Sequence, residues 1–407
     1  MKILLATSAA IPSGGGIASY NQELLQLLGK DNEFHLLTSA DEHNVEGYLS
    51  TECVYRININ DYNIARLVID KINSKQFDLI INSDSELVSI SAPFLKAPII
   101  TVAHFVNGIL ADRAGINSEY VNTIISLSYY GKAYLEKKFG ITDASKVKVV
   151  YNFVRKKCFE SGKENNRKLV IVYPGGTSIK KSLDVVMDVA YRLKRTKLDF
   201  IFYWLGNTIL PSANFSIFGV KDLRQMLHDD PRFVITGFVP REQSESIISS
   251  ANVFLLPSRG EGCPMTLLEA MRAGCIPIVS DAKHGSRELV EKSNFGFVIK
   301  QGDSKAICSL INDIICNHDR YREYYLGTKQ FSDDELSPQK WGDQMSVIIK
   351  QAVDSTRTTE IFSEFSYKTS LLKYKRLLKQ DRRIAKLNSF INRVKMDWLF
   401  LKWKGWK

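Results

Sequence analysis

The sequence contains few cysteines, and no two of them form a C-x-x-C pair. The six are scattered along the chain at Cys53, Cys158, Cys263, Cys275, Cys308 and Cys316. This pattern favours a reducing compartment and argues against a disulfide framework or a structural zinc site. No run of eighteen apolar residues occurs, so we expect no transmembrane helix. The short apolar run KILLATS at the N-terminus predicts a buried strand, not a secretory signal.

The first 367 residues carry no excess charge of either sign. Of 55 Lys and Arg, 13 lie in residues 368–407, whereas only 2 of 44 Asp and Glu lie there. The remaining chain therefore has 42 basic and 42 acidic residues, and the whole net charge of +11 belongs to the C-terminal segment. Such a confined excess predicts an anionic partner for this segment alone.

Short apolar runs alternate with longer amphipathic segments along most of the chain, which predicts an α/β fold with parallel sheets. We expect strands at KILLATS, FHLLTS, FDLIINS, APIITVAHF, NTIISLS and VKVVYN, and, after a polar linker at 155–167, at LVIVYPGG, FIFYWLG, RFVITGF, VFLLPS and IPIVSD. The predicted domains are 1–160 and 161–335, both Rossmann-like and doubly wound, then a returning helix at 336–355 and a tail at 356–407. A ligand is expected in a cleft where the carboxyl ends of the two sheets face each other.

The segment RGEGCPMTLLEAMRAG carries two glutamates in different settings. Glu261 falls in a glycine-bearing loop, Pro264 suits the first position of a helix, and Glu269 falls on that helix. Free amides at a helix N-terminus suit a phosphate, and carboxylates suit pairs of sugar hydroxyls. The order matches a sugar nucleotide. The competing interpretation is an acidic residue near a helix dipole plus a surface glutamate, although the apolar neighbours of Glu269 make a solvated role less natural.

This segment, continued to EGCPMTLLEAMRAGCIPIVSD, closely resembles the E-x7-E block of family 4 of the retaining GT-B glycosyltransferases. IPSGGGIASYNQELLQLL is similar to the first loop and helix of that family, and GFVPREQSESIISSANVFLLPS to the approach to its glutamate block. The resemblance spans roughly residues 1–350. It implies two Rossmann-like domains facing across a cleft, with 1–160 on the acceptor side and 161–335 binding a nucleoside diphosphate sugar as donor. It also implies transfer with retention, and neither a metal nor a cofactor.

The resemblance also implies roles for individual residues. Glu269 would bind the ribose hydroxyls of the donor, Glu261 the donor sugar near the reacting carbon, and Lys181 the departing diphosphate. His104, at the end of a predicted strand, would contact the donor sugar. Lys181 could otherwise be an ordinary helix-start lysine, and a lone histidine is often structural. The implied catalytic set is Glu261, Lys181 and His104, and the donor-binding set is Glu269, Gly15, Gly16, Gly262, Cys263, Pro264, Met265, Thr266, Gly175, Gly176 and Lys180.

Two positions depart from the family pattern. The family usually has an arginine where this chain has Gly176, and Lys180 would supply only a point charge in place of a bidentate fork. The family typically has a Pro-Asn-Gly turn where this chain has Tyr151, Asn152 and Phe153, so only Asn152 matches. The first departure puts the usual way of holding the donor phosphates in doubt.

The resemblance implies front-face substitution, in which the departing phosphate helps to deprotonate the acceptor. Such a protein mainly positions two substrates and stabilises the leaving diphosphate. No Ser/His/Asp or Cys/His arrangement is visible. The glycines at 14–16 do not fit a nicotinamide fingerprint, because Ser19 stands where the third glycine belongs.

The pattern of the tail predicts a basic amphipathic helix, with three tryptophans in the last ten residues. The apolar positions at helical spacing are Leu371, Leu372, Leu378, Ile384, Leu387, Ile391 and Val394. An anionic membrane surface is the favoured partner for residues 368–407. Nucleic acid and packing on the enzyme or on another protein are the alternatives, and nucleic acid is not expected because the domains are neutral and lack a matching motif.

The leading hypothesis is therefore a retaining transfer of sugar to a glycan or lipid-linked acceptor, in bacterial-type surface polysaccharide biosynthesis. The protein would be cytoplasmic and peripheral at the inner face of the membrane. Two alternatives stay open: a soluble sugar or sugar-phosphate synthase of the same fold, and a non-catalytic GT-B subunit that scaffolds a partner transferase.

Overall fold

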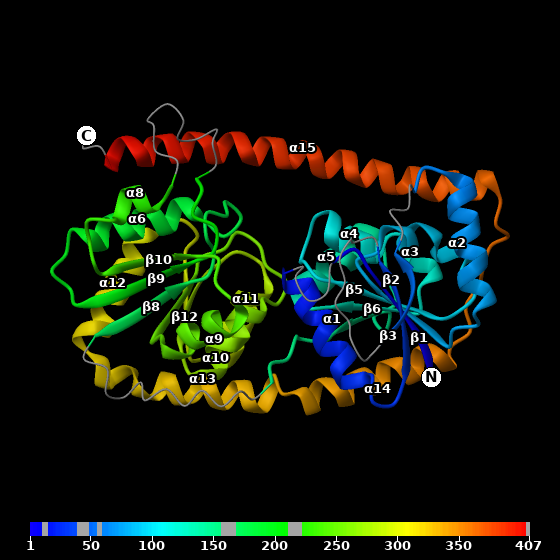
Figure 1. Cartoon of the computed structure of the whole chain (residues 1–407), viewed down its shortest axis with the longest axis horizontal. Coiled ribbons are helices and arrows are strands. Elements are labelled where there is room, and N and C mark those ends of the chain that lie inside the picture. Colours follow the sequence, from blue (N-terminus) through cyan, green and yellow to red (C-terminus); the bar gives the residue numbers. More distant parts are fainter. Residues whose placement is uncertain (10–14, 39–48, 55–58, 156–167, 211–221, 404–407) are drawn as a thin grey trace. The chain divides into compact units, whose positions relative to one another are not determined.

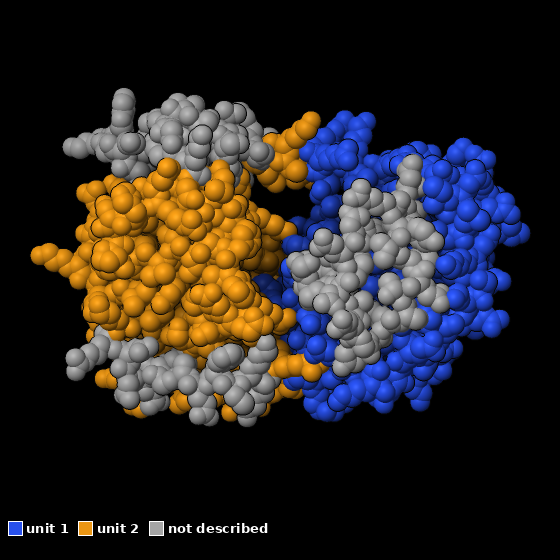
Figure 2. Space-filling model, viewed as in Figure 1, with its two compact units in different colours: residues 1–153, 262–265, 338–383 blue, residues 154–261, 266–337, 384–407 orange. Residues whose placement is uncertain are grey.

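The computed structural model describes the chain except for residues 10–14, 39–48, 55–58, 156–167, 211–221 and 404–407. The predicted linker falls almost entirely in one of these gaps. Two compact units make up the chain (Figure 2). Unit 1 comprises Met1–Phe153, Gly262–Met265 and Pro338–Arg383, and unit 2 comprises Val154–Glu261, Thr266–Ser337 and Ile384–Lys407.

Unit 1 contains a seven-stranded parallel sheet in the order β3-β2-β1-β4-β5-β6-β7 (Figure 1). Its strands are β1 (Lys2–Thr7), β2 (Glu33–Thr38), β3 (Leu49–Val54), β4 (Leu79–Ser83), β5 (Ile99–Ala103), β6 (Thr123–Ser126) and β7 (Val147–Val149). Its helices are α1 (Gly15–Leu28), α2 (Tyr62–Ser74), α3 (Glu86–Ser91), α4 (Ile109–Gly115), α5 (Tyr129–Phe139) and α14 (Pro338–Asp354), with α15 (Glu364–Trp403) beginning here. The strands β4 and β5 are buried along their whole length, as expected for a parallel sheet covered on both faces.

Unit 2 contains a six-stranded parallel sheet in the order β10-β9-β8-β11-β12-β13. Its strands are β8 (Leu169–Tyr173), β9 (Phe200–Leu205), β10 (Phe233–Gly237), β11 (Val253–Leu256), β12 (Ile276–Ser280) and β13 (Phe297–Ile299). Its helices are α6 (Leu183–Lys194), α8 (Arg224–Leu227), α9 (Arg241–Ser250), α10 (Met265–Arg272), α11 (Gly285–Ser293), α12 (Ser304–Cys316) and α13 (Arg322–Glu335). The expected fold class, two Rossmann-like doubly wound α/β sheets, is confirmed.

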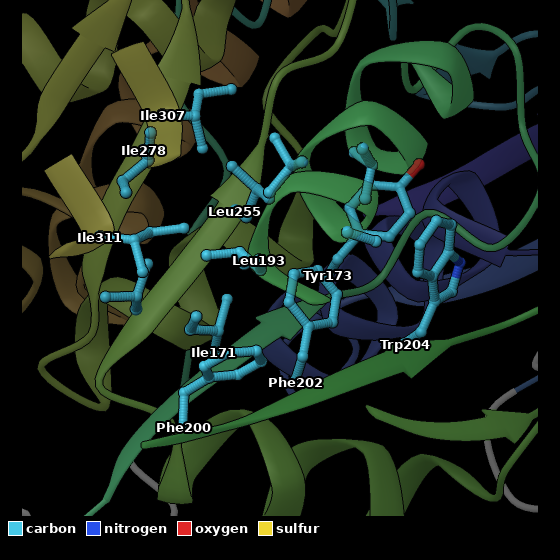
Figure 3. Packing of buried hydrophobic residues seen from close by; sticks show 14 of the residues in the cluster. Ile171, Tyr173, Leu193, Phe200, Phe202, Trp204, Leu255, Ile278, Ile307 and Ile311 are labelled. Carbon is cyan, nitrogen blue, oxygen red and sulfur yellow. The ribbon is translucent and has the colours of Figure 1, made fainter. Parts of the chain in front are cut away.

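Large aromatic side chains fill the core of unit 2 at one face of its sheet (Figure 3). Tyr173 on β8 and Trp204 on β9 are fully buried, with ring centroids 5.1 Å apart in an edge-to-face arrangement. Leu193 of α6 and Ile311 of α12 belong to the same cluster. Full burial of such aromatic side chains is a main source of stability in a core of this kind. The cluster fixes the ends of β8 and β9, after which the candidate binding loop begins.

The apolar stripe of the basic tail lies partly in the core of unit 1. Tyr367, Leu371 and Tyr374 of α15 are buried there, and Leu378 packs against the same cluster. Packing on the enzyme, one of the predicted alternatives, therefore describes this stretch, because every third or fourth residue faces the protein. Among the described side chains of the predicted stripe, Leu372 and Ile384 are exposed. The side chains of Leu387, Ile391, Val394 and the three tryptophans lie outside the described part. Within the described residues, no helix is long and apolar enough to cross a membrane.

Candidate functional site

The sheet of unit 2 has its switch point between β8 and β11. The chain runs from β8 outward through β9 to β10, and then returns to place β11, β12 and β13 on the other side. Open parallel sheets bind ligands beyond the carboxyl ends of their strands at such a point. The loop 174–182 follows β8, and residues 257–261 follow β11. The topology therefore brings Lys180 and Lys181 to the same edge of the sheet as Glu261.

Arg259 ties these two loops together. Its main-chain N–H donates to the Lys180 carbonyl at 2.9 Å, and its Nη1 donates to the Ile179 carbonyl at 2.5 Å. Its Nη2 lies 2.7 and 2.6 Å from the two carboxylate oxygens of Asp184, in the first turn of α6. A guanidinium is suited to such multiple planar contacts. Sequence reasoning missed Arg259, although its place two residues before Glu261 at a strand end was a signal.

The loop that carries the two lysines is closely packed on the end of β8. The hydroxyl of Tyr173 donates to the carbonyl of Lys181 at 3.1 Å, and burial raises the pKa of Tyr173, so this hydroxyl stays a neutral donor. A methyl group at Gly175 would lie 2.0 Å from the same hydroxyl. Lys180 is exposed and Lys181 is half-buried. The loop can therefore offer a ligand two cationic side chains.

Gly176 has no room for a side chain. Its φ is +52°, and a Cβ there would lie 2.6 Å from the backbone nitrogen of Asn207. Its N–H donates to the Leu205 carbonyl at 2.8 Å, and its carbonyl accepts from Nε1 of Trp204 at 2.9 Å. An arginine at this position would require the backbone to move. The departure from the family pattern is therefore built into the packing of the β8 and β9 loops.

Glu261 is a buried carboxylate in the loop after β11. Its residue is 8% exposed, and the hydroxyl of Ser258 donates to its Oε1 at 3.0 Å. Its main-chain carbonyl accepts from the N–H of Gly285 at 3.3 Å, at the start of α11. A buried carboxylate needs hydrogen-bond donors, and each carboxylate oxygen has two acceptor sites. Glu261 can therefore accept further hydroxyl donors from a ligand.

His284 supports the Glu261 loop from beneath. Its Nδ1 accepts from the N–H of Arg287 at 3.3 Å, so Nε2 carries the proton when the ring is neutral. Nε2 lies 3.1 Å from the carbonyl of Ser258, which can accept that proton. Burial lowers the pKa of His284, so the ring is neutral near pH 7. His284 and Ser258 therefore orient Glu261, and sequence reasoning did not identify either of them.

Glu269 lies on α10, whereas Glu261 lies on the loop before it, as predicted for both. The Glu269 side chain is 17% exposed, and its Oε1 lies 3.8 Å from Nη2 of Arg241 at the start of α9. Nε of Arg241 lies 2.8 Å from Oε1 of Glu245. The nearby Arg241 guanidinium therefore helps to orient the partly exposed Glu269 carboxylate. The purely solvated alternative for Glu269 does not describe its position.

The N-terminus of α10 follows the glutamate loop directly. The helix begins at Met265, so Pro264 stands immediately before its first residue and not within it. Gly262, Cys263, Pro264 and Met265 group with unit 1, and Thr266 groups with unit 2. The first amides of a helix have no intrahelical partner and can bind an anion. The helix ends at Arg272, and Gly274 follows with a φ of +73°, which is the expected stop.

His104 lies at the carboxyl edge of the unit 1 sheet, directly after β5. Its Nε2 lies 2.8 Å from Oγ of Ser83 at the end of β4, and its ring meets the edge of Tyr20 at 4.9 Å. Burial lowers the pKa of His104 to about 4, so the imidazole is neutral near pH 7. Gly15 and Gly16 are the first residues of α1, and within the described residues no atom would lie within 4 Å of a Cβ at either.

Asp84 is the centre of a polar cluster at the same edge that sequence reasoning did not identify. Its φ is +78°, a conformation that a non-glycine residue adopts at a cost of about 1–3 kcal/mol and that recurs at functional sites. Its Oδ1 accepts from Thr7 Oγ1 at 3.1 Å and from the N–H of Ser8 at 2.8 Å. Its Oδ2 accepts from Ser8 Oγ at 2.7 Å. Asp84 therefore joins the ends of β1 and β4 at the switch point of unit 1.

Residues 154–330 match the family described as Glycosyl transferases group 1. WcaL of Escherichia coli K12, assigned as a colanic acid biosynthesis glycosyltransferase, is 31% identical over 165 residues, which cover 39% of this chain and 36% of that protein. The amylovoran biosynthesis glycosyltransferase AmsK of Erwinia amylovora is 29% identical over 138 residues, 32% of each chain. The chain thus spans about a third of the length of these curated relatives.

Solved structures share the fold over most of the chain. The protein HepE of Anabaena, crystallised with UDP, has a TM-score of 0.69 at 15% identity, covering 86% of this chain and all of that one. The lipopolysaccharide outer core galactosyltransferase WaaB has a TM-score of 0.65 at 18% identity, covering 86% of this chain and 99% of that one. At these identities the likeness establishes the fold alone, that of GT-B proteins with two Rossmann-like domains.

Proposed function

We propose that this protein is a metal-independent retaining glycosyltransferase of family 4, which transfers a sugar from a nucleoside diphosphate sugar to a glycan or lipid-linked acceptor in surface polysaccharide assembly. The observation that carries the proposal is the joining of two loops by Arg259 at the switch point of unit 2. It holds the lysine-bearing loop beside the loop of Glu261. The group 1 match covers this region, and the relatives named above are assigned to polysaccharide biosynthesis.

The chemistry of the site suits the proposed donor. Glu269 accepts hydrogen bonds from the ribose hydroxyls, and Glu261, buried and oriented by Ser258, accepts them from the donor sugar. The first amides of α10 and the cation of Lys181 stabilise the charge that develops on the departing diphosphate, where fixed electrostatic groups contribute most. Because no arginine can occupy position 176, the lysine loop supplies the positive charge. His104 contacts the donor sugar as a neutral imidazole.

Binding and turnover of nucleotide sugars test this proposal in two steps. Thermal stability is measured with UDP, GDP and their sugar derivatives, since a ligand that binds the folded state raises its stability. The variants Glu269→Gln and Lys181→Met are expected to lower affinity for the best ligand at least tenfold. Glu291→Gln is the matched control, because Glu291 also pairs with an arginine four residues away, on α11, and should bind normally.

Turnover is then measured as nucleotide-sugar hydrolysis and as transfer, with the anomeric configuration of the product read by NMR and the reaction repeated in EDTA. Inverted product, or activity abolished by EDTA and restored by a metal, contradicts the proposed mechanism. Specific binding without any turnover favours the non-catalytic scaffold. Activity that survives both Glu269→Gln and Lys181→Met refutes the assignment of the site.

We also propose that the exposed face of α15 binds an anionic membrane surface and holds the protein at the inner face of the membrane. Arg382, Arg383 and Lys386 are exposed on the part of α15 that follows the residues buried in the core of unit 1. Each basic residue near an anionic surface contributes about 1 kcal/mol. Replacing these three by glutamine should release the protein from phosphatidylglycerol vesicles in a sedimentation assay.

Lys373→Gln is the control for the vesicle assay, because Lys373 lies on the same helix but 3.3 Å from Glu119. Retained binding of the triple variant contradicts the membrane proposal. Point substitutions are preferable to deletion of 368–407, since that deletion would remove the core residues Leu371 and Tyr374.

A further inference from the structure

The helix α15 reaches the polar cluster of unit 1 through one side chain. The hydroxyl of Tyr374 accepts from Nε of Arg113, on α4, at 3.1 Å. Tyr374 is completely buried, and burial, with the neighbouring Glu86 carboxylate, raises its pKa, so the hydroxyl stays neutral. A buried hydroxyl paired with a cation is a strong and directional contact. The C-terminal helix therefore fixes the orientation of the Arg113 guanidinium.

Arg113 in turn holds the end of β4. Its Nη1 donates to the main-chain carbonyl of Asp84 at 3.3 Å and lies 3.9 Å from Oδ2 of the same residue, while its Nη2 pairs with Glu86. The Arg113 side chain is only 13% exposed, so little water competes for these contacts. The left-handed backbone of Asp84 requires support from its surroundings. Arg113 supplies part of that support from outside the strand.

A second set of contacts joins α15 to the same region. A methyl group on Gly108, which precedes α4, would lie 3.2 Å from Oδ1 of Asp381, so α15 meets α4 at its start as well as at Arg113. Ser370 accepts from Nδ2 of Asn117 at 2.6 Å and donates to the Ile90 carbonyl at 2.6 Å. The segment between β5 and β6, which follows His104 and carries Arg113, is thus held by α15 at several points.

We propose that Tyr374 is a positioning residue for the strand-end cluster of unit 1, acting through Arg113 on Asp84. The helix α15 thereby also sets the geometry of the carboxyl edge of the unit 1 sheet, where Asp84 and His104 lie. That this edge serves the donor sugar through His104 rests on the function proposed above, whereas the coupling itself does not. Packing of α15 on unit 1 and ordering of the ends of β1 and β4 should then occur together.

Hydrogen–deuterium exchange of the full-length protein, followed by mass spectrometry, tests the coupling without any substrate. We expect Tyr374→Phe to speed exchange at least threefold in peptides that cover 5–9 and 82–86. Tyr367→Phe is the matched control, because Tyr367 lies in the same helix and core cluster but donates its hydroxyl to Ile59, at 2.8 Å. Equal effects of the two variants on these peptides, or no effect of either, overturn the proposal.

A double variant separates a relay through Arg113 from general loosening of the helix. In Arg113→Lys the ammonium cannot bond Tyr374, Glu86 and Asp84 together, so the same peptides should exchange faster. Adding Tyr374→Phe should then cause little further change in the exchange rate, since both substitutions break the same chain of contacts. Fully additive effects on the exchange rate would overturn the proposed role of Arg113. Affinity for UDP should stay within twofold in Tyr374→Phe. If no nucleotide sugar is turned over by the wild type, the proposed function fails while the exchange result still stands.

Discussion

The absence of a side chain at Gly176 can be tested by adding one methyl group. Gly176→Ala places a Cβ where the backbone nitrogen and oxygen of Asn207 would be 2.6 and 2.9 Å away. The matched control is Gly302→Ala in the same unit. Gly302 also has a positive φ, +89°, but its Cβ would meet nothing within 4 Å. The control therefore carries the backbone penalty without the clash.

The expected loss of stability in each variant follows from the backbone penalty and from the steric clash. An alanine in the left-handed region costs about 1–2 kcal/mol, so Gly302→Ala should lower the free energy of unfolding of unit 2 by about that amount. Forcing an extra carbon into a packed site typically adds about 1–3 kcal/mol. Gly176→Ala should therefore lose about 2–5 kcal/mol. The neighbour cannot yield easily, since the atoms it meets are backbone and Gly206 is already in contact with Gly176.

The measurement is urea denaturation of the full-length protein, read by pulse proteolysis with fragments mapped to each unit. A common loss of about 1 kcal/mol in both variants would refute the packing argument at Gly176. A loss at Gly176→Ala that exceeds that of the control, with unit 1 unaffected, supports the argument.

Three further predictions concern the two sites. Arg259→Lys should weaken binding of the best nucleotide ligand about tenfold, because one ammonium cannot bond both Ile179 and Asp184. Calorimetric titration measures the affinity, and an unchanged affinity would exclude a positioning role for Arg259. Burial lowers the pKa of His104 to about 4, so the unfolded chain binds a proton that the folded one excludes as pH falls below about 6.5. The free energy of unfolding should fall by up to about 3 kcal/mol between pH 6.5 and 4, and denaturation of His104→Gln, which should lose less, checks this. Ser258→Ala should reduce kcat and lower the free energy of unfolding by about 1–3 kcal/mol, because the buried Glu261 carboxylate loses a donor. A steady-state assay beside a melting curve measures both; normal turnover would argue against orientation of Glu261 by Ser258.

Most of the fold follows from the pattern of apolar runs. The runs KILLATS and VFLLPS are uninterrupted because strands of a parallel sheet are buried on both faces, and both proved to be strands, β1 and β11. The strand β3 was not predicted, since LSTECV mixes polar and apolar residues at the edge of the sheet. The short β13 was missed for a similar reason: its three residues are only half-buried.

The site was only partly predictable, because the sequence pattern identifies residues and not their partners. The loop position of Glu261 and the helical position of Glu269 follow from Pro264 and the glycines around them. Arg259, Asp84 and His284 could not be found in this way. Each acts through contacts with chain segments that are distant in sequence, and a left-handed φ at Asp84 leaves no compositional trace.

For the tail, the sequence pattern identifies an apolar stripe but not the surface that the stripe contacts. A helical apolar period among basic residues fits a membrane surface and a protein surface equally well, and period alone does not choose between them. Leu371 packs in the core of unit 1 together with Tyr367 and Tyr374. For this stretch of the helix, the apolar residues therefore contact protein.

The contribution of α15 to the core of unit 1 has a consequence for synthesis. Tyr367, Leu371 and Tyr374 leave the ribosome only after all the strands of unit 2, yet they complete the core that begins with Leu4 on β1. Domains generally fold as units while the chain emerges from its N-terminus, but unit 1 must wait for its own C-terminal segment. Nascent chains that end before residue 367 should therefore leave the apolar surface of unit 1 uncovered and open to chaperones, although unit 2 would already have most of its sequence.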